Sequence, residues 1–519
     1  MKHHLLLSIV FILGAITLML EVLAVRILSP YSGNTIYTYS SVLSIILAAL
    51  SVGYYLGGIL SECKNLVRLF YEIILITGVS ILLIRLMDIF ILPIIGYKLP
   101  YQTGPLIMSI MLFFLPGLLL GIISPLAINI RKKTYPKQKA GKIFSEILFF
   151  STIGNIFGGL STSFIFIPNF GISIIITAAG IILLVIGIGG LILNNSIKGK
   201  TKYIVIFILA TSLFINFSSE ETGQPVIYSK DGVYEKIKVF DTFFKGKPVR
   251  VLQQDRSISG VMYLPSGEIT PQNMKYFILY KLYKNDIKNA LILGGGAYLI
   301  PKELLKISPN AEINVAEIEP ILFDIAKKYF YLPDDKRLHN YTIDGRKFLN
   351  SIDKKYDLIY SDAFYTYFSL PVNFSTYEFF RSIKQHLNSE GIAIINLIDE
   401  LTPKKKSFIF SEMKTLKTVF LNCHFFAVAS PFSKEVQNII FLGYNGNKKI
   451  DINNKEVTNN ENPLIKGLPE KIINLTLYDL ERYPILTDDY SPVEYLIGNT
   501  LKNIKTDKKI TALFDFLPD

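Results

Sequence analysis

The residues with the clearest chemical character follow short apolar runs in the middle of the chain. The run that begins at Ala290 stops at three consecutive glycines, Gly294, Gly295 and Gly296. That pattern is typical of a buried parallel strand that turns into a phosphate- or nucleoside-binding loop. Two later runs end at the acidic residues Glu317 and Asp362. In a doubly wound α/β sheet, ligands bind at the carboxyl ends of the strands, where these residues would lie.

The spacing of these residues narrows the class of ligand. Gly296 and Glu317 are 21 positions apart, close to the roughly 20 residues that place a carboxylate on ribose hydroxyls in nucleotide-binding βαβ units. The third glycine of a G-x-G-x-x-G pattern is replaced by Leu299, which disfavours a dinucleotide. A nucleoside without phosphate, such as S-adenosylmethionine or its decarboxylated form, fits better. A plain glycine turn is the alternative.

Long apolar runs dominate the first 217 residues. Half of the 519 residues are hydrophobic, and a bilayer crossing needs about 20 of them in succession. We expect residues 1–217 to form a multi-span membrane domain that contacts the lipid bilayer, with about seven helices. The expected spans are Leu5–Leu28, Ile36–Leu60, Leu66–Ile84, Pro105–Ile128, Ile143–Ile167, Ile172–Leu193 and the short Tyr203–Phe217.

Positive charge is concentrated in the same part of the chain. Residues 1–217 carry a net charge of +10 and the remainder only +2, so the basic balance belongs to membrane loops and does not indicate nucleic-acid binding. Cys63 and Cys423 lie in different halves and imply neither a disulfide nor a zinc site.

The loop from Arg131 to Lys142 is the strongest signal for membrane orientation. By the positive-inside rule it is cytoplasmic. Seven spans would then place the carboxyl-terminal half outside a cell membrane, whereas S-adenosylmethionine chemistry belongs in the cytoplasm, so the two arguments conflict. Ionisable groups within or near the spans indicate either helix packing or a transport-like role. They are Glu21, Arg26, Glu72, Arg85, Asp88 and Glu146.

The second half of the chain reads as a small β subdomain, residues 218–289, followed by an α/β domain, residues 290–519. The β subdomain is expected to end in a helix over Pro271–Tyr283. Strands and helices then alternate, with about seven strands. The strand-like segments are Ala290–Leu293, Glu312–Ala316, Tyr356–Tyr360, Ile392–Leu397, His424–Val428 and Asn438–Leu442.

Taken in order, the motifs resemble the spermidine synthase (polyamine aminopropyltransferase) family. They are most similar to the branch with an N-terminal multi-span membrane domain. In the membrane half the resemblance rests on Glu21–Tyr31 and Gly53–Gly58. In the second half it rests on Gly294–Gly296, Glu317–Pro320, Asp344-Gly345-Arg346, Tyr356–Phe364 and Thr487-Asp488-Asp489-Tyr490.

The resemblance implies a fold and a reaction. A small β domain would precede a Rossmann-like sheet of the S-adenosylmethionine-transferase type. An aminopropyl group would move from decarboxylated S-adenosylmethionine, a co-substrate, to putrescine or a related amine, giving spermidine or another polyamine and methylthioadenosine. No tightly bound cofactor and no metal is implied. A homo-oligomer is left open.

The resemblance also assigns roles to individual residues. Gly294, Gly295 and Gly296 would lie under the nucleoside donor, and Glu317 would hold its ribose hydroxyls. Asp344 and Gly345 would meet the adenine, and Glu235 stands where the family has a glutamine that contacts the nucleoside donor. Asp362 matches the general base. The acceptor side would include Tyr276 and Tyr365.

These residue types suit the chemistry. A sulfonium is already a good leaving group, so no acid catalyst is needed. An amine is protonated at neutral pH, and a carboxylate can attract the cation and then take its proton. In-line alignment of amine, carbon and sulfur supplies much of the remaining rate. Tyr365, which follows Asp362 closely, could hold a polyamine through cation–π contact.

Three departures from the family pattern leave alternatives open. Ala297 stands where the family has an aspartate in the glycine loop, Tyr365 replaces a second aspartate, and Tyr276 is all that matches a Tyr-His-Glu motif. One alternative is a methyltransferase that uses intact S-adenosylmethionine. Another is a non-catalytic polyamine-binding transporter or sensor.

Overall fold

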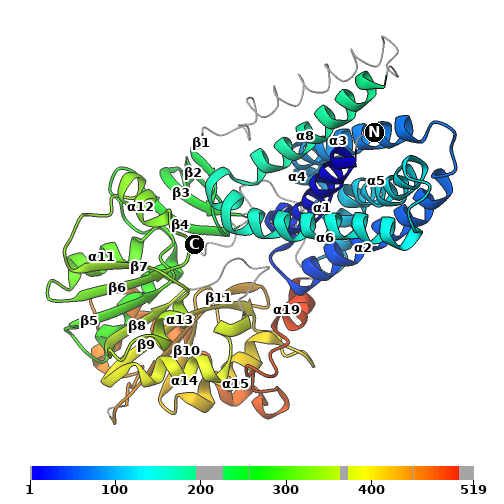
Figure 1. Ribbon diagram of the computed structural model, residues 1–519. Helices are drawn as coiled ribbons and strands as arrows, with labels where there is room; N and C mark the ends of the chain where they lie inside the picture. The colour runs from blue at the N-terminus through cyan, green and yellow to red at the C-terminus, as the bar shows by residue number, and fades with distance from the viewer. Residues whose placement is uncertain are drawn as a thin grey trace. The chain divides into compact units, whose positions relative to one another are not determined.

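The structure is a computed structural model of the 519-residue chain, and it describes residues 3–96, 98–194, 226–255, 257–362, 372–447 and 449–501. The chain divides into two compact units, Met1–Glu221 and Thr222–Asp519. The described part of the first unit is helical, and the second unit combines two β-sheets with helices (Figure 1).

The described part of the first unit contains six helices that are long and apolar enough to cross a membrane. These helices are α1 (His3–Ser32), α2 (Ile36–Leu60), α3 (Leu66–Phe90), α5 (Gly104–Thr134), α6 (Ala140–Ser161) and α8 (Ile172–Leu193). The span of α6 continues through the π-helical η1 (Thr162–Phe166) into α7 (Ile167–Phe170), and the short α4 (Leu92–Ile95) follows α3. Six expected spans are therefore present, and this half of the chain is a membrane-protein region. The seventh, Tyr203–Phe217, lies outside the described residues.

Glycines allow three pairs of these helices to pack with their backbones in contact. A Cβ atom on Gly53 of α2 would lie 2.2 Å from the carbonyl oxygen of Leu118 on α5. A Cβ atom on Gly158 of α6 would lie 2.0 Å from that of Ala15 on α1. Such small-residue contacts are typical of helices packed in a bilayer. Glycine at these positions therefore sets the spacing of the α2–α5 and α1–α6 pairs, and α3 and α8 pack in the same way.

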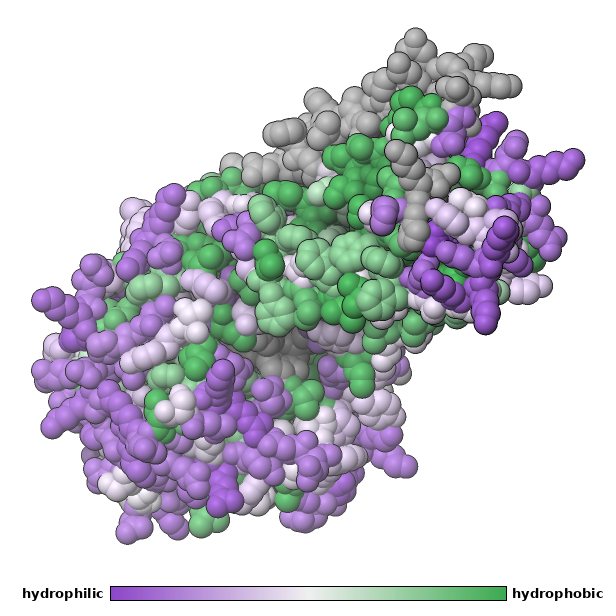
Figure 2. Space-filling model, viewed as in Figure 1, coloured by the Kyte–Doolittle hydropathy of each residue, from purple (hydrophilic) through white to green (hydrophobic). Residues whose placement is uncertain are grey.

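The outward faces of these helices are apolar, and most of their charged groups are paired. Large apolar residues remain exposed, and they colour much of the visible helical surface green in Figure 2. Arg85 Nη1 lies 2.7 Å from Asp88 Oδ2, and Arg131 Nη2 of α5 lies 2.8 Å from Glu146 Oε2 of α6. For these groups the pairing favours a packing role over transport.

The second unit begins with a four-stranded antiparallel sheet in the order β1-β2-β3-β4. Its strands are β1 (Val226–Asp231), β2 (Lys236–Phe244), β3 (Lys247–Gln254) and β4 (Ser257–Tyr263). The helix expected over Pro271–Tyr283 is instead a single α-helical turn, α10 (Gln272–Lys275), followed by the 3₁₀-helix η2 (Tyr276–Leu282). Three aromatic residues with modest helix propensity, Tyr276, Phe277 and Tyr280, lie in η2 and are buried.

A seven-stranded mixed sheet follows, in the order β10-β11-β9-β8-β5-β6-β7. The five strands from β9 to β7 run parallel. Strand β11 runs antiparallel to β9, and β10 runs antiparallel to β11. The strands are β5 (Asn289–Leu293), β6 (Glu312–Glu317), β7 (Leu338–Thr342), β8 (Tyr356–Ser361), β9 (Leu387–Glu400), β10 (Cys423–Ala427) and β11 (Val436–Tyr444).

Helices cover both faces of this sheet (Figure 1). Side chains of α11 (Leu299–Ile307) and α12 (Leu322–Tyr329) share one apolar core with Ala290 and Ile292 of β5 and with the four-stranded sheet. Leu291 and Leu293, which point the other way, share a second core with three other helices. These are α13 (Gly345–Asn350), α14 (Tyr377–Gln385) and α15 (Phe408–Val419).

The strand order places a topological switch point between β5 and β8. From β5 the chain continues to β6 and β7 on one side, and then returns to β8 and β9 on the other. The carboxyl ends of β5 and β8 are therefore adjacent, and the crevice outside them is where open α/β sheets bind ligands. Gly294 follows β5 and Asp362 follows β8.

Candidate active site

The glycine loop is held on two sides by backbone contacts. Gly294 and Gly296 have positive φ angles of 90° and 52°, which favour glycine. The N–H of Gly294 donates to the carbonyl oxygen of Ala316 on β6, at 3.0 Å. A Cβ atom on Gly296 would lie 2.7 Å from the carbonyl oxygen of Ser259 on β4. The loop therefore has a fixed path between the two sheets.

Glu317, the last residue of β6, binds this loop through its carboxylate. Its Oε2 accepts from the N–H groups of Gly295 at 2.7 Å and Gly296 at 3.2 Å, and its Oε1 accepts from the N–H of Glu319 at 2.8 Å. Burial raises the pKa of the Glu317 carboxyl, and the three backbone hydrogen bonds oppose that rise. A carboxylate oxygen accepts more than one hydrogen bond, so ribose hydroxyls can be added to this arrangement.

Tyr298 lies under the glycine loop and is fully buried. A Cβ atom on Gly295 would lie 2.5 Å from Cε2 of its ring, and its hydroxyl donates to Asn340 Oδ1 at 2.6 Å. Its φ angle of 54° places it in the left-handed region that few non-glycine residues adopt. Burial and the charge of Glu317 raise the pKa of the Tyr298 hydroxyl.

Ala297, between the loop and Tyr298, does not point into open space. Its side chain is 2% exposed, and a Cβ atom on Gly260 of β4 would lie 2.3 Å from the Ala297 Cβ. The position at which the family pattern has an aspartate is thus packed against the four-stranded sheet.

Asp344 and Gly345 lie at the start of α13. Asp344 is the N-cap residue, and its Oδ1 accepts from the N–H of Lys347 at 2.9 Å. A Cβ atom on Gly345 would lie 3.3 Å from Leu293 Cδ2 and 3.4 Å from Phe374 Cε1. These contacts bring Gly345 next to the end of β5.

Asp362 is fixed by contacts to both neighbouring strands. Its N–H donates to the carbonyl oxygen of Leu293 on β5 at 3.0 Å, and its Oδ1 accepts from Asn396 Nδ2 of β9 at 2.8 Å. Burial raises the pKa of the Asp362 carboxyl, and the Asn396 hydrogen bond opposes that rise. Tyr360, two residues earlier on β8, has a hydroxyl whose pKa is raised by burial and by the Asp362 charge.

Of the residues expected at the site, the structure brings together the glycine loop, Glu317, Gly345 and Asp362, all around the end of β5. Glu235 is 3% exposed and accepts from Gln254 Nε2 at 2.8 Å, where β2 begins and β3 ends. Tyr276 is buried in the core that also contains Ala297, and burial raises its pKa to about 12. Tyr365 lies outside the described residues.

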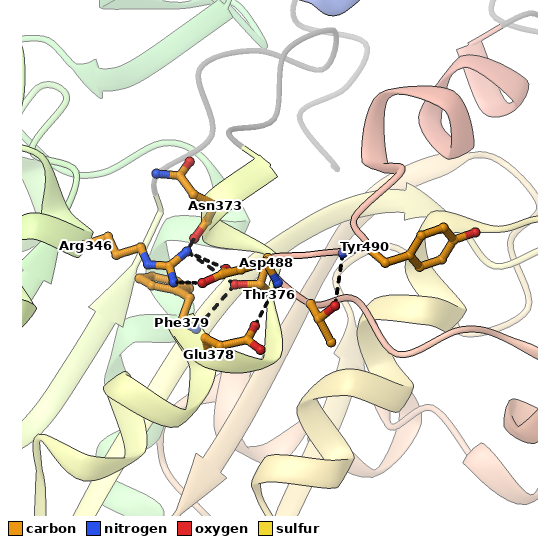
Figure 3. A network of polar contacts seen from close by, with 8 residues as sticks. Arg346, Asn373, Thr376, Glu378, Phe379, Asp488 and Tyr490 are labelled. Atoms are coloured by element: carbon orange, nitrogen blue, oxygen red, sulfur yellow. Dashed lines mark hydrogen bonds and ion pairs between the residues drawn. The ribbon is translucent and has the colours of Figure 1, made fainter.

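Two motifs that are distant in the sequence, those of Arg346 and Asp488, meet beside the site. The sequence did not predict this contact. Arg346 Nη1 donates to Asp488 Oδ1 at 2.8 Å, and Nη2 pairs with Asp488 Oδ2 (Figure 3). Nη1 also donates to the carbonyl oxygen of Asn373 at 3.0 Å and contacts the Thr376 hydroxyl, while Asp488 N–H donates to Glu378 Oε2 at 2.9 Å. This Arg346–Asp488 clamp ties the start of α13 to a segment 142 residues away.

Within the described residues, no group of three or more His, Cys, Asp or Glu side chains is arranged to hold a metal ion. The candidate site lies at the carboxyl ends of β5 and β8, where open α/β sheets bind ligands. It combines a glycine loop, a carboxylate bonded to that loop, and a second carboxylate across from it.

Comparison with known proteins finds a matching family profile and several polyamine aminopropyltransferases. The family profile described as "Spermine/spermidine synthase domain" matches residues 279–454. A polyamine aminopropyltransferase of Vibrio vulnificus is 26% identical over 205 residues, which are 37% of this chain and 65% of that protein. Polyamine aminopropyltransferase 2 of Aquifex aeolicus is 25% identical over 415 residues, 74% of this chain and 77% of that protein.

A solved structure is also similar. The probable spermidine synthase from Corynebacterium glutamicum is 20% identical, with a TM-score of 0.44, over 52% of this chain and 98% of that one. The sequence matches place residues 279–454 in the spermidine/spermine synthase family of polyamine aminopropyltransferases, and the described residues before them include six long apolar helices.

Proposed function

We propose that this chain transfers an aminopropyl group from decarboxylated S-adenosylmethionine to putrescine or a related amine, with Asp362 as the general base. The observation that carries the proposal is the position of Asp362. It follows β8, its N–H bonds to the end of the glycine-loop strand, and its carboxylate lies across the switch point from Glu317. A base at that position would be next to the reacting carbon of a nucleoside held by the loop.

The step balances without further reagents. An ammonium group of the acceptor gives a proton to the Asp362 carboxylate. The amine nitrogen then forms a bond to the methylene carbon beside the sulfonium. The carbon–sulfur bond breaks, and its electron pair stays on sulfur as the neutral thioether of methylthioadenosine. Glu317 would hold the ribose hydroxyls, Asp344 and Gly345 the adenine, and Glu235 the nucleoside donor. Tyr276 and Tyr365 would line the acceptor side.

Methyl transfer from intact S-adenosylmethionine is the second candidate. It is favoured by one observation: Ala297 is packed against Gly260 and provides no carboxylate that would repel the methionine carboxylate of the intact form. The two candidates differ in which form of the nucleoside binds and in which product leaves, so one experiment separates them.

The test uses the full chain purified in detergent. Binding of decarboxylated and intact S-adenosylmethionine is measured by calorimetry, with putrescine and then spermidine added. Preferred binding of the decarboxylated form, with methylthioadenosine released on addition of an amine, supports aminopropyl transfer. Preference for the intact form, with S-adenosylhomocysteine released, supports methyl transfer. Binding of neither form overturns both and directs attention to the helical unit.

Replacement of the base gives the sharper result. Asp362→Asn can keep the hydrogen bond from Asn396 through its own amide oxygen, so the site should stay assembled. We expect binding of the nucleoside donor to be retained and turnover to fall about 10²- to 10⁴-fold. Asp353→Asn, the same change at an exposed position before β8, is the control and should leave turnover unchanged. Unchanged turnover in Asp362→Asn would remove Asp362 from the mechanism.

We also propose that the catalytic unit faces the cytoplasm. With the Arg131–Lys142 loop inside, six crossings return the chain to the cytoplasmic side after α8, and a seventh by Tyr203–Phe217 would reverse this. The test uses a variant in which Cys63 and Cys423 are both replaced by serine and one cysteine is introduced at exposed Leu421. It is labelled in sealed vesicles of known orientation. Reaction with a membrane-impermeant reagent from the external side would contradict the proposal.

A further inference from the structure

Two buried amides form a chain that ends on the carboxylate of Asp362. Asn438 Nδ2 of β11 donates to Asn396 Oδ1 of β9 at 3.0 Å, and Asn396 Nδ2 donates to Asp362 Oδ1 at 2.8 Å. Asn396 is 2% exposed and Asn438 is 6% exposed. We refer to Asn438 and Asn396 as the amide chain.

The register of the sheet places these side chains together. Ser361 of β8 pairs with Ile395 of β9, so Asp362 and Asn396 are the next residues of their two strands. Asn396 pairs with Ile440 of β11, and Asn438 precedes Ile440 by two residues, on the same face of that strand. The amide chain therefore crosses three adjacent strands at the end where the candidate site lies.

The surroundings make these two amides costly unless they are bonded. The neighbours along β9 and β11, Ile395, Leu397 and Ile439, are fully or almost fully buried apolar residues. An amide without a hydrogen-bond partner in such a place is strongly disfavoured. Each of the adjacent strands β9 and β11 carries one such amide. Asn438 is hydrogen-bonded to Asn396, and Asn396 to Asp362.

The direction of the bonds matters for Asp362. An asparagine amide has an N–H₂ end and a C=O end, and rotation of its terminal group exchanges them. Because Asn438 donates to the oxygen of Asn396, the N–H₂ group of Asn396 must face Asp362. The opposite orientation would place a carbonyl oxygen against a carboxylate. Asn438 thus fixes which end of Asn396 meets the base.

We infer that Asn396 and Asn438 are positioning residues for the reaction: they hold Asp362 ionised and aimed, with Oδ1 occupied and Oδ2 left for the incoming ammonium. The inference rests on the proposed role of Asp362 as base. A hydrogen bond from Nδ2 stabilises the charged carboxylate more than the neutral acid, and it fixes the rotamer. Loss of the bond should therefore weaken the base at neutral pH and loosen its alignment with the acceptor.

The variants Asn396→Leu, Asn438→Leu and Asn438→Asp test this inference in the full chain. Asn396→Leu removes the bond to Asp362. We expect kcat to fall about 10- to 100-fold with little change in the KM of the nucleoside donor, and the acid limb of the pH–rate profile to move to higher pH. Asn438→Leu should act in the same direction more weakly, since it removes only the group that orients Asn396. Asn438→Asp replaces that N–H₂ group with an acceptor, turns the amide of Asn396 around, and should match or exceed the effect of Asn396→Leu.

A matched control separates positioning from general loss of stability. Asn314 on β6 is also a buried amide, 4% exposed, and it donates to the Tyr356 hydroxyl at 2.9 Å. Asn314→Leu should lower the melting temperature without moving the acid limb. If Asn396→Leu and Asn438→Asp leave the acid limb where the unmodified protein has it, the inference is wrong.

A readout without turnover distinguishes this inference from the proposed function. The infrared carboxyl band of Asp362 is obtained as the difference between the unmodified protein and Asp362→Asn, with ¹³C-labelled aspartate, across a pH series. When the same difference is measured in protein that carries Asn438→Asp, the midpoint of the Asp362 titration should lie at higher pH than in the unmodified protein. If the protein releases no methylthioadenosine but the titration midpoint of Asp362 shifts in this way, the proposed function is contradicted and the role of the amide chain is supported. An unmoved midpoint overturns the amide chain in either case.

Discussion

Breaking the Arg346–Asp488 clamp should cost stability and weaken binding of the nucleoside donor. The ion pair is bidentate, and Arg346 also bonds the carbonyl oxygen of Asn373. Bidentate geometry strengthens a charge pair, but the Asp488 side chain is 42% exposed, so solvent screens the interaction. We therefore expect a coupling energy of about 1–2 kcal/mol, above the roughly 0–1 kcal/mol of ordinary exposed pairs.

A double-mutant cycle measures that coupling. Arg346→Met, Asp488→Asn and the double variant are compared by thermal unfolding and by the KM for the nucleoside donor. Because Arg346 directly follows Asp344 and Gly345, a loosened α13 should raise that KM several-fold with kcat little changed. The Arg346 hydrogen bond lowers the pKa of Asp488, so the stabilisation is present above the ordinary aspartate range and is lost as pH falls through the lowered pKa.

A second bidentate pair provides the control. Arg337 pairs with Asp335 through Nη2 at 2.7 Å and Nε at 3.0 Å, and it also bonds backbone carbonyl groups, in the segment before β7. Asp335→Asn should lower stability similarly and leave the KM unchanged. The reasoning about the clamp fails if its two single variants are additive in the double variant, or if the KM responds equally to Asp335→Asn.

Three further outcomes are expected. Burial holds the pKa of Glu412 well above its usual value, so its contribution to stability is present below the unfolded pKa and lost as pH rises through the raised one. Glu412→Gln should therefore raise the melting temperature at pH 8 and change it little at pH 4; an equal rise at both would contradict this. Gly53→Val should separate α2 from α5 and abolish recovery of folded protein, whereas Gly58→Val, where a Cβ meets nothing within 4 Å, should not. Tyr298→Phe should cost about 1 kcal/mol in denaturant unfolding through the lost bond to Asn340, and no loss would argue against that bond.

The sequence predicted the parts of the fold and site that local patterns encode. Apolar runs of bilayer length predicted the six described spans. The stop at Gly294 and the later Glu317 predicted a glycine loop and a strand-end carboxylate, which the structure brings into contact. Asp362 was identified as a strand-end carboxylate because the apolar residues Leu358, Ile359 and Tyr360 come shortly before it, in a strand that is fully buried.

Features that depend on long-range pairing were not predictable. Strand β7 has the polar sequence Leu-His-Asn-Tyr-Thr and lies at the sheet edge, so no hydrophobic pattern marked it. The bond between Asn396 and Asp362 depends on the β8–β9 register, which no single segment specifies. The Arg346–Asp488 clamp joins residues too far apart in the chain for any spacing rule.

The switch point also implies an order of assembly. The loop and the carboxylate that binds it belong to one local unit, β5–α11–β6, whose parallel strands are joined by a short crossover helix. Asp362 joins them only when β8 pairs with β5, after the chain has passed through β6 and β7. Local contacts form before distant ones because they cost less loop-closure entropy. During synthesis, the chain would therefore complete the glycine loop and the Glu317 carboxylate before Asp362 reaches them. If the proposed roles hold, a folding intermediate would bind the co-substrate before it could consume it.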